Sequence, residues 1–309
     1  MVPVVAVVAA AGALVLAGCS TSPVASKAAV AGASGGGTVI PVAASINAWG
    51  SILAQLGGSH VKATSIITNP DTDPHDYEPT PADGRVIASS RLFVENGIGY
   101  DSWAARAVQA SPDSARQVID VGPLTGTPVG GNPHRWYSPS DVSKVADAIT
   151  ADLTKIDPAD AGYFTAQRSA FENTALAQYH RLITDIKTTY AGTPVGASES
   201  IFAPLADALG LDLITPASFL KDISEGTDPS AADKATIDAQ ISSKKIKVYV
   251  YNSQNSTPDV SAQVAAAKRQ GIPVASVTET LSPAGASFQD WQSAQLRSLE
   301  AALAKAAGK

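Results

Sequence analysis

The segment 157-DPADAGYFTAQRSAFENTALAQYHRLITDIKTTYA-191 decides how the rest of the chain is organised. It shows no strand pattern, its only glycine is Gly162, and its large apolar residues recur at helical spacing. Asp157 and Pro158 supply an N-cap and a first-turn proline, and the pattern ends at Gly192. We therefore predict one helix of roughly 30 residues, about 45 Å long, that joins two flanking lobes. A coiled coil and a kinked pair of helices are the alternatives.

Short apolar strands alternate with helical patterns on both sides of this segment. Strands are predicted at 39–44, 61–68, 92–95, 117–121, 194–197, 212–214, 246–251 and 274–277. Helices are predicted at 48–56, 85–90, 101–109, 201–209, 231–242, 260–269 and 287–306. Such alternation is typical of βαβ units. The expected fold class is therefore α/β, with two similar lobes, 39–156 and 192–309, each built on a central parallel sheet and joined by the 157–191 helix.

Residues 1–19 are expected to be a lipoprotein signal peptide, and residues 20–38 a flexible tether. The run from Val2 to Ala17 carries no charge and, at about 16 residues, is short for a transmembrane helix. It ends in small residues before Cys19, the only cysteine of the chain, as at a bacterial lipidation site. We therefore expect lipid on Cys19 to anchor the protein at the outer face of the cell membrane. The first basic residue is only Lys27, which departs from the usual signal and leaves the true start codon open.

Composition narrows the function classes. The chain has 309 residues, 45% of them hydrophobic, which is enough for a large core. Its net charge of −6 and the lack of a long basic run argue against nucleic acid as a partner.

Two of the four histidines, His75 and His134, directly follow a proline in a loop that comes after a predicted strand. In open α/β sheets, ligands bind in the crevice beyond the carboxyl ends of the strands. In the second lobe, Glu199 and Glu279 follow predicted strands in the same way. Imidazole suits first-row transition metals, and carboxylates shift the preference toward Mn²⁺. The four side chains together predict a metal site between the lobes, whereas each of them alone is typical of a solvated loop residue.

The remaining histidines are weaker candidates. His60 follows a glycine pair in a turn and is expected to be exposed to solvent, and His180 is expected on the surface of the long helix. Asp73 and Asp76 flank His75 and either orient its imidazole or are ordinary loop acids.

Three motifs resemble those of the cluster A-I solute-binding lipoproteins of zinc and manganese ABC importers. They are 73-DPHDYEPT-80 and 132-NPHRW-136, which carry His75 and His134, and the strand-and-turn segment 94-VENGIGYDSW-103. The resemblance covers the chain from Val39 onward. It implies two α/β lobes joined by a rigid backbone helix, with the metal held in the cleft between the lobes.

The same resemblance implies the other two ligands. Glu199 matches a position that is His in many zinc members and Glu in manganese-type members. Glu279 matches a position that is usually Asp, so its side chain is one methylene longer than that of most family members. The alternative fourth ligand is Asp222 or a water molecule. The stretch Thr125 to Gly131 replaces the His-rich loop of many zinc members. These departures favour Mn²⁺ or Fe²⁺, although such a site also holds Zn²⁺.

The expected function is capture of Zn²⁺ or Mn²⁺ for the permease of an ABC importer, without catalysis. A zinc hydrolase is a rival, but the chain has no HExxH motif, and four protein ligands leave no open position for water. A surface adhesion lipoprotein would need only the anchor. A receptor for another solute, such as a siderophore, would line its pocket with arginine or aromatic residues.

Overall fold

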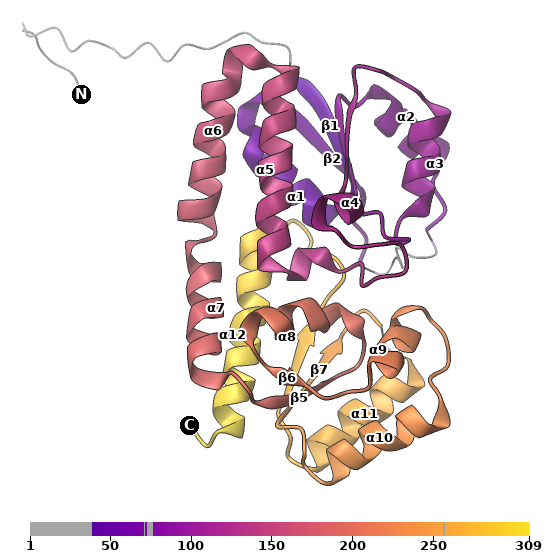
Figure 1. Ribbon diagram of the computed structural model, residues 1–309, viewed down its shortest axis with the longest axis vertical. Helices are drawn as coiled ribbons and strands as arrows, with labels where there is room; N and C mark the ends of the chain where they lie inside the picture. Colours follow the sequence, from indigo (N-terminus) through magenta and orange to yellow (C-terminus); the bar gives the residue numbers. More distant parts are fainter. Residues whose placement is uncertain (1–38, 71, 73–76, 256) are drawn as a thin grey trace, which may run out of the picture. The chain divides into compact units, whose positions relative to one another are not determined.

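The computed structural model describes residues 39–70, 72, 77–255 and 257–309, whose strands form two four-stranded sheets (Figure 1). The first has the order β2-β1-β3-β4, with β1 at Ile40–Ile46, β2 at Val61–Ile67, β3 at Leu92–Glu95 and β4 at Gln117–Asp120. The second has the order β6-β5-β7-β8, with β5 at Pro194–Ala197, β6 at Asp212–Leu213, β7 at Val248–Asn252 and β8 at Val274–Val277. Every strand pair is parallel, so the α/β fold class is confirmed.

The two sheets share one topology, because the first strand of each half lies second in its sheet. In a parallel sheet all carboxyl ends lie at one edge, and the crevice opens where the strand order reverses. At this edge of the first sheet, β3 ends at Glu95. At the same edge of the second sheet, β5 ends at Ala197, β7 at Asn252 and β8 at Val277. The functional candidates of the second lobe therefore begin within two residues of a strand end.

Helices pack around the sheet of each half of the chain (Figure 1). In the first half they are α1 Asn47–Gly57, α2 Pro81–Ser89, α3 Ser102–Ala110, α4 Val121–Thr125 and α5 Pro139–Ile156. In the second half they are α8 Ala203–Leu209, α9 Ala217–Ser224, α10 Ala231–Ser242, α11 Pro258–Arg269 and α12 Phe288–Ala306. Short 3₁₀ turns are η1 Gly58–His60, η2 Arg135–Tyr137, η3 Pro158–Asp160 and η5 Ser200–Phe202.

Four of these helices differ from the sequence-based expectation. Helix α2 begins at Pro81 rather than residue 85, because Thr80 and Asp83 form a reciprocal capping box at its start. Helices α4, α5 and α9 were not predicted at all. Helix α5 nevertheless has a first-turn proline, Pro139, and buries residues at three- and four-residue spacing, namely Val142, Val145, Ala146, Ile149 and Leu153.

The segment predicted as one long helix is helical from Pro158 to Tyr190 and runs along one side of the molecule (Figure 1). It consists of η3, α6 Ala161–Ala170, a π-helical turn η4 Phe171–Ala175, and α7 Ala177–Tyr190. The amide of Leu176 donates to the carbonyl of Phe171 over 2.9 Å, which is the wide i→i−5 bond of a π-bulge. The backbone helix is therefore continuous but carries one bulge near its middle.

One large hydrophobic core runs through both halves. Its largest fully buried side chains include Trp49 of α1, Trp136 of η2 and Trp291 of α12. Trp49 and Trp136 meet edge to face, with ring centroids 6.3 Å apart. Helix α12 of the second lobe packs against α7, and α1 of the first lobe packs against α6 and α12, so both lobes are tied to the backbone helix. A smaller core lies beneath α9, α10 and α11.

Within the described part of the chain, no helix combines the length and the apolar character needed to cross a membrane. The predicted signal peptide, the tether and Cys19 lie outside the described residues.

Candidate metal centre

Three of the four predicted ligands lie together where the strands of the two sheets end. His134 is in the loop before η2 and is fully buried. Glu199 follows β5 by two residues and is 1% exposed, and Glu279 follows β8 by two residues, with its side chain 14% exposed. His134 Nε2 lies 3.2 Å from Glu279 Oε1. The fourth candidate, His75, lies outside the described residues, as do its neighbours Asp73 and Asp76.

The orientation of His134 is set by Asn132. The side-chain nitrogen of Asn132 donates to the carbonyl of Ser200 over 2.7 Å, so its oxygen must face the histidine. That oxygen lies 2.9 Å from His134 Nδ1 and 3.1 Å from the backbone nitrogen of His134. In the neutral imidazole the proton is therefore on Nδ1, and the lone pair of Nε2 points toward Glu279. Nε2 and Glu279 Oε1 thus place a nitrogen and an oxygen donor side by side, the atom types that bind first-row transition metals.

Glu199 is buried in the second lobe and is held by two amides. Asn252 donates to its Oε1 over 2.5 Å, and Asn255 donates to its Oε2 over 2.7 Å. The amide of Asn252 also lies 3.4 Å from Glu279 Oε1, so it links the two carboxylates. Burial, and then the negative charge of Glu279, raise the pKa of Glu199 to about 7. Two carboxylates so close in a dry site concentrate negative charge that a divalent cation would neutralise.

Glu279 is positioned from both lobes. Tyr100, which follows β3, donates its phenolic hydrogen to Glu279 Oε2 over 3.0 Å. The backbone amide of Glu279 donates to Gln254 Oε1 over 2.7 Å. The alternative ligand Asp222 lies on α9. Of these two acids, Glu279 is the one in contact with His134, although its role as a ligand stays a prediction.

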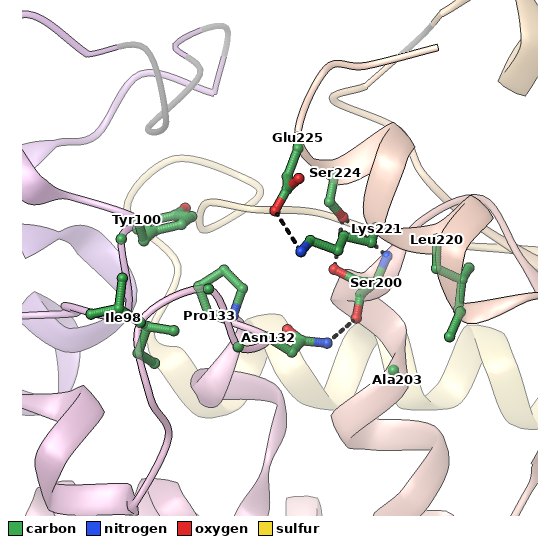
Figure 2. A pocket seen from close by; sticks show the side chains of 15 residues that line it. Ile98, Tyr100, Asn132, Pro133, Ser200, Ala203, Leu220, Lys221, Ser224 and Glu225 are labelled. Carbon is green, nitrogen blue, oxygen red and sulfur yellow. Dashed lines mark hydrogen bonds and ion pairs between the residues drawn. The ribbon is translucent and has the colours of Figure 1, made fainter. Parts of the chain in front are cut away.

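A pocket of about 470 Å³ opens beside these residues, between loops of the first half and η5 and α9 of the second (Figure 2). Its lining includes Tyr100, which bonds to Glu279, and Asn132 and Pro133, which directly precede His134. Figure 2 shows the Asn132 side chain directed at Ser200 across the pocket. On the opposite wall Lys221 pairs with Glu225 at 3.6 Å. His134, Glu199 and Glu279 therefore form a mostly buried cluster whose neighbouring residues line this pocket.

The other two histidines lie outside the pocket. His180 is on the surface of α7, as expected, with its side chain 41% exposed. The expectation that His60 is exposed was wrong, because its side chain is only 22% exposed and its ring stacks on Tyr163 at 4.0 Å.

Sequence reasoning did not identify the residues that contact the candidate ligands. Asn132 and Tyr100 were noted only as parts of motifs, and Asn252 and Asn255 were not singled out. One signal was available, because Asn252 is the last residue of β7, at the same sheet edge as Glu199 and Glu279.

Comparison with known proteins places the chain among metal-binding proteins. A model of the zinc-uptake complex component A periplasmic family matches residues 42–302. The manganese-binding lipoprotein MntA of Halalkalibacterium halodurans is 28% identical over 209 residues, which is 65% of this chain and 66% of MntA. The iron-binding protein YfeA of Yersinia pestis is 30% identical over 125 residues, 38% of this chain and 40% of YfeA. The matched stretches thus span less than two thirds of each relative.

The fold is also found among solved structures. The cadmium-bound periplasmic metal-binding protein of Candidatus Liberibacter asiaticus superposes with a TM-score of 0.68 at 19% identity, over 85% of this chain and 98% of that chain. This similarity extends the two-lobed α/β architecture to a protein of low sequence identity.

Proposed function

Because the chain belongs to the zinc-uptake complex component A family, whose members are solute-binding proteins rather than enzymes, we propose that it captures Zn²⁺ or Mn²⁺ outside the cytoplasm for an ABC importer. The observation that carries this proposal is the contact between His134 Nε2 and Glu279 Oε1 at 3.2 Å, with Nδ1 committed to Asn132. With this geometry, a nitrogen lone pair and a carboxylate oxygen lie close enough to bind the same metal ion.

The proposed ligands are His75, His134, Glu199 and Glu279. Two imidazole nitrogens and two carboxylates form a closed set in which the carboxylates cancel the charge of a divalent ion. Such a set leaves no open position for an activated water, which supports binding and release rather than hydrolysis.

The choice of metal follows from two opposing tendencies. Carboxylate oxygens favour harder ions such as Mn²⁺. Most nitrogen and oxygen sites nevertheless bind Zn²⁺ more tightly than Fe²⁺ or Mn²⁺. The relatives include a manganese-binding lipoprotein and an iron-binding protein, while the matching family model is one of zinc uptake, so these names support more than one metal. We propose that Mn²⁺ and Zn²⁺ both bind, with Fe²⁺ as a further candidate.

Delivery is proposed to depend on a lipid anchor at Cys19 and on recognition by the importer's permease. The residues that bridge the lobes, Tyr100 to Glu279 and Asn132 to Ser200, touch the ligands directly. Because the lobes also share a core, we expect the metal to order local loops rather than to swing whole lobes. The permease would then recognise those ordered loops around the cleft.

Metal titration tests the proposal. The protein is stripped with a chelator and titrated by calorimetry with Mn²⁺ or Zn²⁺ at neutral pH, alongside His134→Ala, Glu199→Gln and Glu279→Gln. We expect one tight cleft site that each substitution weakens, whereas Asp222→Asn, at the alternative fourth ligand, should leave it unchanged. Loss of binding in Asp222→Asn with retention in Glu279→Gln would reassign the fourth ligand. Failure of all three ligand substitutions to weaken binding would refute the cleft site and favour an adhesion protein or another solute.

A further inference from the structure

A second cluster of metal-ligating side chains lies outside the cleft. It consists of His60 of η1, Asp157 and Asp160. Asp157 directly follows α5 and Asp160 is in η3, so both lie in the turn that joins α5 to α6, at the top of Figure 1. One ligand atom from each of the three lies within 4.8 Å of the others. His60 Nδ1 is 2.8 Å from Asp160 Oδ2. The cluster shares no residue with the cleft.

The imidazole of His60 is held in place before any ion binds. Its ring stacks on Tyr163 with centroids 4.0 Å apart and meets the edge of Phe164 at 5.9 Å. The hydroxyl of Tyr163 is fixed in turn, because the amide of Ser59 donates to it over 3.0 Å. Gly58 makes this packing possible, since a Cβ there would lie 2.1 Å from that hydroxyl.

The two carboxylates are held by the backbone of a tight turn. The amide of Asp160 donates to the carbonyl of Asp157 over 3.2 Å, and Pro158 between them has a fixed φ. One imidazole faces two carboxylates, so even a protonated His60 leaves a net negative charge. Within the described part of the chain, neither Asp157 nor Asp160 forms an ion pair with lysine or arginine. The cluster therefore carries negative charge that a bound cation would neutralise.

We propose that His60, Asp157 and Asp160 form a second divalent-cation site that takes Zn²⁺ through His60 Nδ1 and one oxygen of each carboxylate. One nitrogen and two oxygen donors suit Zn²⁺, and water completes the coordination because the side chains are partly exposed. The ion would join η1, directly after α1, to the start of the backbone helix. The site does not depend on the cleft.

Counting zinc in the whole protein tests this site. The probe is Zn²⁺, measured by equilibrium dialysis and native mass spectrometry after chelator treatment. We expect two ions per chain in the unchanged protein and one in a His134→Ala/Glu279→Gln variant. Adding Asp157→Asn and Asp160→Asn to that variant should remove the remaining ion. Loss of a direct ligand should weaken zinc binding by more than the roughly 10–100-fold that an outer partner costs.

Two controls keep the test decisive. His180→Ala removes a histidine that faces a single carboxylate, Glu172 at 3.6 Å, and should leave the zinc count unchanged. In the unsubstituted protein, nuclear magnetic resonance should show a zinc-dependent shift of the His60 Nδ1 signal, which needs no variant to fold. A cleft-inactive variant that binds no zinc, or a His60 signal that zinc leaves unmoved, would overturn the second site. Zinc binding to the cleft and to the second site is measured in separate variants. The absence of either site can therefore be recognised independently of the other.

Discussion

Tyr100 donates a 3.0 Å hydrogen bond to Glu279 Oε2, although 179 residues separate them in the chain. Tyr100 follows the third strand of the first sheet, whereas Glu279 follows the last strand of the second. The bond directs one carboxylate oxygen away from the cluster and leaves the other, Oε1, toward His134. A residue of the first lobe thus orients a proposed ligand supplied by the second.

Tyr100→Phe should therefore weaken metal binding without changing the ligand set. The ring is retained and only the donor is lost, so the expected cost is that of an outer-shell partner, roughly 10–100-fold in affinity. Calorimetric titration with Mn²⁺ and Zn²⁺ measures it. Tyr190→Phe, at the end of α7, is the control for loss of a hydroxyl elsewhere. Equal affinities for Tyr100→Phe and the unchanged protein would show that Glu279 does not need this bond.

Asn132 should have two separable roles, because its oxygen faces His134 and its nitrogen bonds the Ser200 carbonyl in the other lobe. Asn132→Ala removes both contacts, whereas Asn132→Asp keeps an acceptor for His134 Nδ1 and loses the donor to Ser200. We expect the alanine variant to lose roughly 10–100-fold in metal affinity and the aspartate variant to lose less. Comparable losses in the two variants would indicate that the bridge to Ser200, and not the histidine orientation, dominates.

The fold was largely predictable because its signals are local. The apolar runs that became β1, β3, β5 and β8 are short and bounded by turn residues, and the strand ends placed Glu199 and Glu279 at one sheet edge. Helix α5 was missed although its proline start and helical spacing were visible. The π-bulge at Phe171 has no comparable local signal.

The partners that hold the site could not be predicted in the same way. Asn252 reaches Glu199 across 53 residues, and Tyr100 reaches Glu279 across 179, so both bonds depend on tertiary packing. The same reason explains the error at His60, because the ring of Tyr163 that covers it comes from α6.

Cys19→Ser should release the protein from the membrane if Cys19 carries the lipid anchor. In the native host, the unchanged protein is expected in the membrane fraction and the serine variant in the soluble extracytoplasmic or culture fraction. Fractionation followed by immunoblotting measures this distribution. Metal affinity should be the same for both proteins, since Cys19 precedes every proposed ligand. Retention of the serine variant in the membrane fraction would contradict anchoring through this residue.

Buried Glu95 should make the metal-free protein less stable as the pH rises. Burial, and then the negative charges of Asp101 and Asp120, raise the pKa of Glu95 from its ordinary 4.5 to about 8. Between these values the folded protein keeps a proton that the unfolded chain has lost. The unfolded state therefore binds fewer protons, and the free energy of unfolding falls with rising pH, by at most about 1.4 kcal/mol per pH unit.

Glu95→Gln should remove this pH dependence, because a neutral amide occupies the same site at every pH. The measurement is chemical denaturation of the chelator-treated protein at intervals from pH 5 to 8. Relative to the unchanged protein, the Glu95→Gln variant should gain stability steadily toward pH 8, by an amount on the order of a few kcal/mol. Glu199, whose pKa is also raised, titrates in both proteins and cancels in the difference. Asp238→Asn, an exposed carboxylate on α10, should show no such gain. A constant difference between Glu95→Gln and the unchanged protein from pH 5 to 8 would mean that Glu95 does not hold its proton in the folded state.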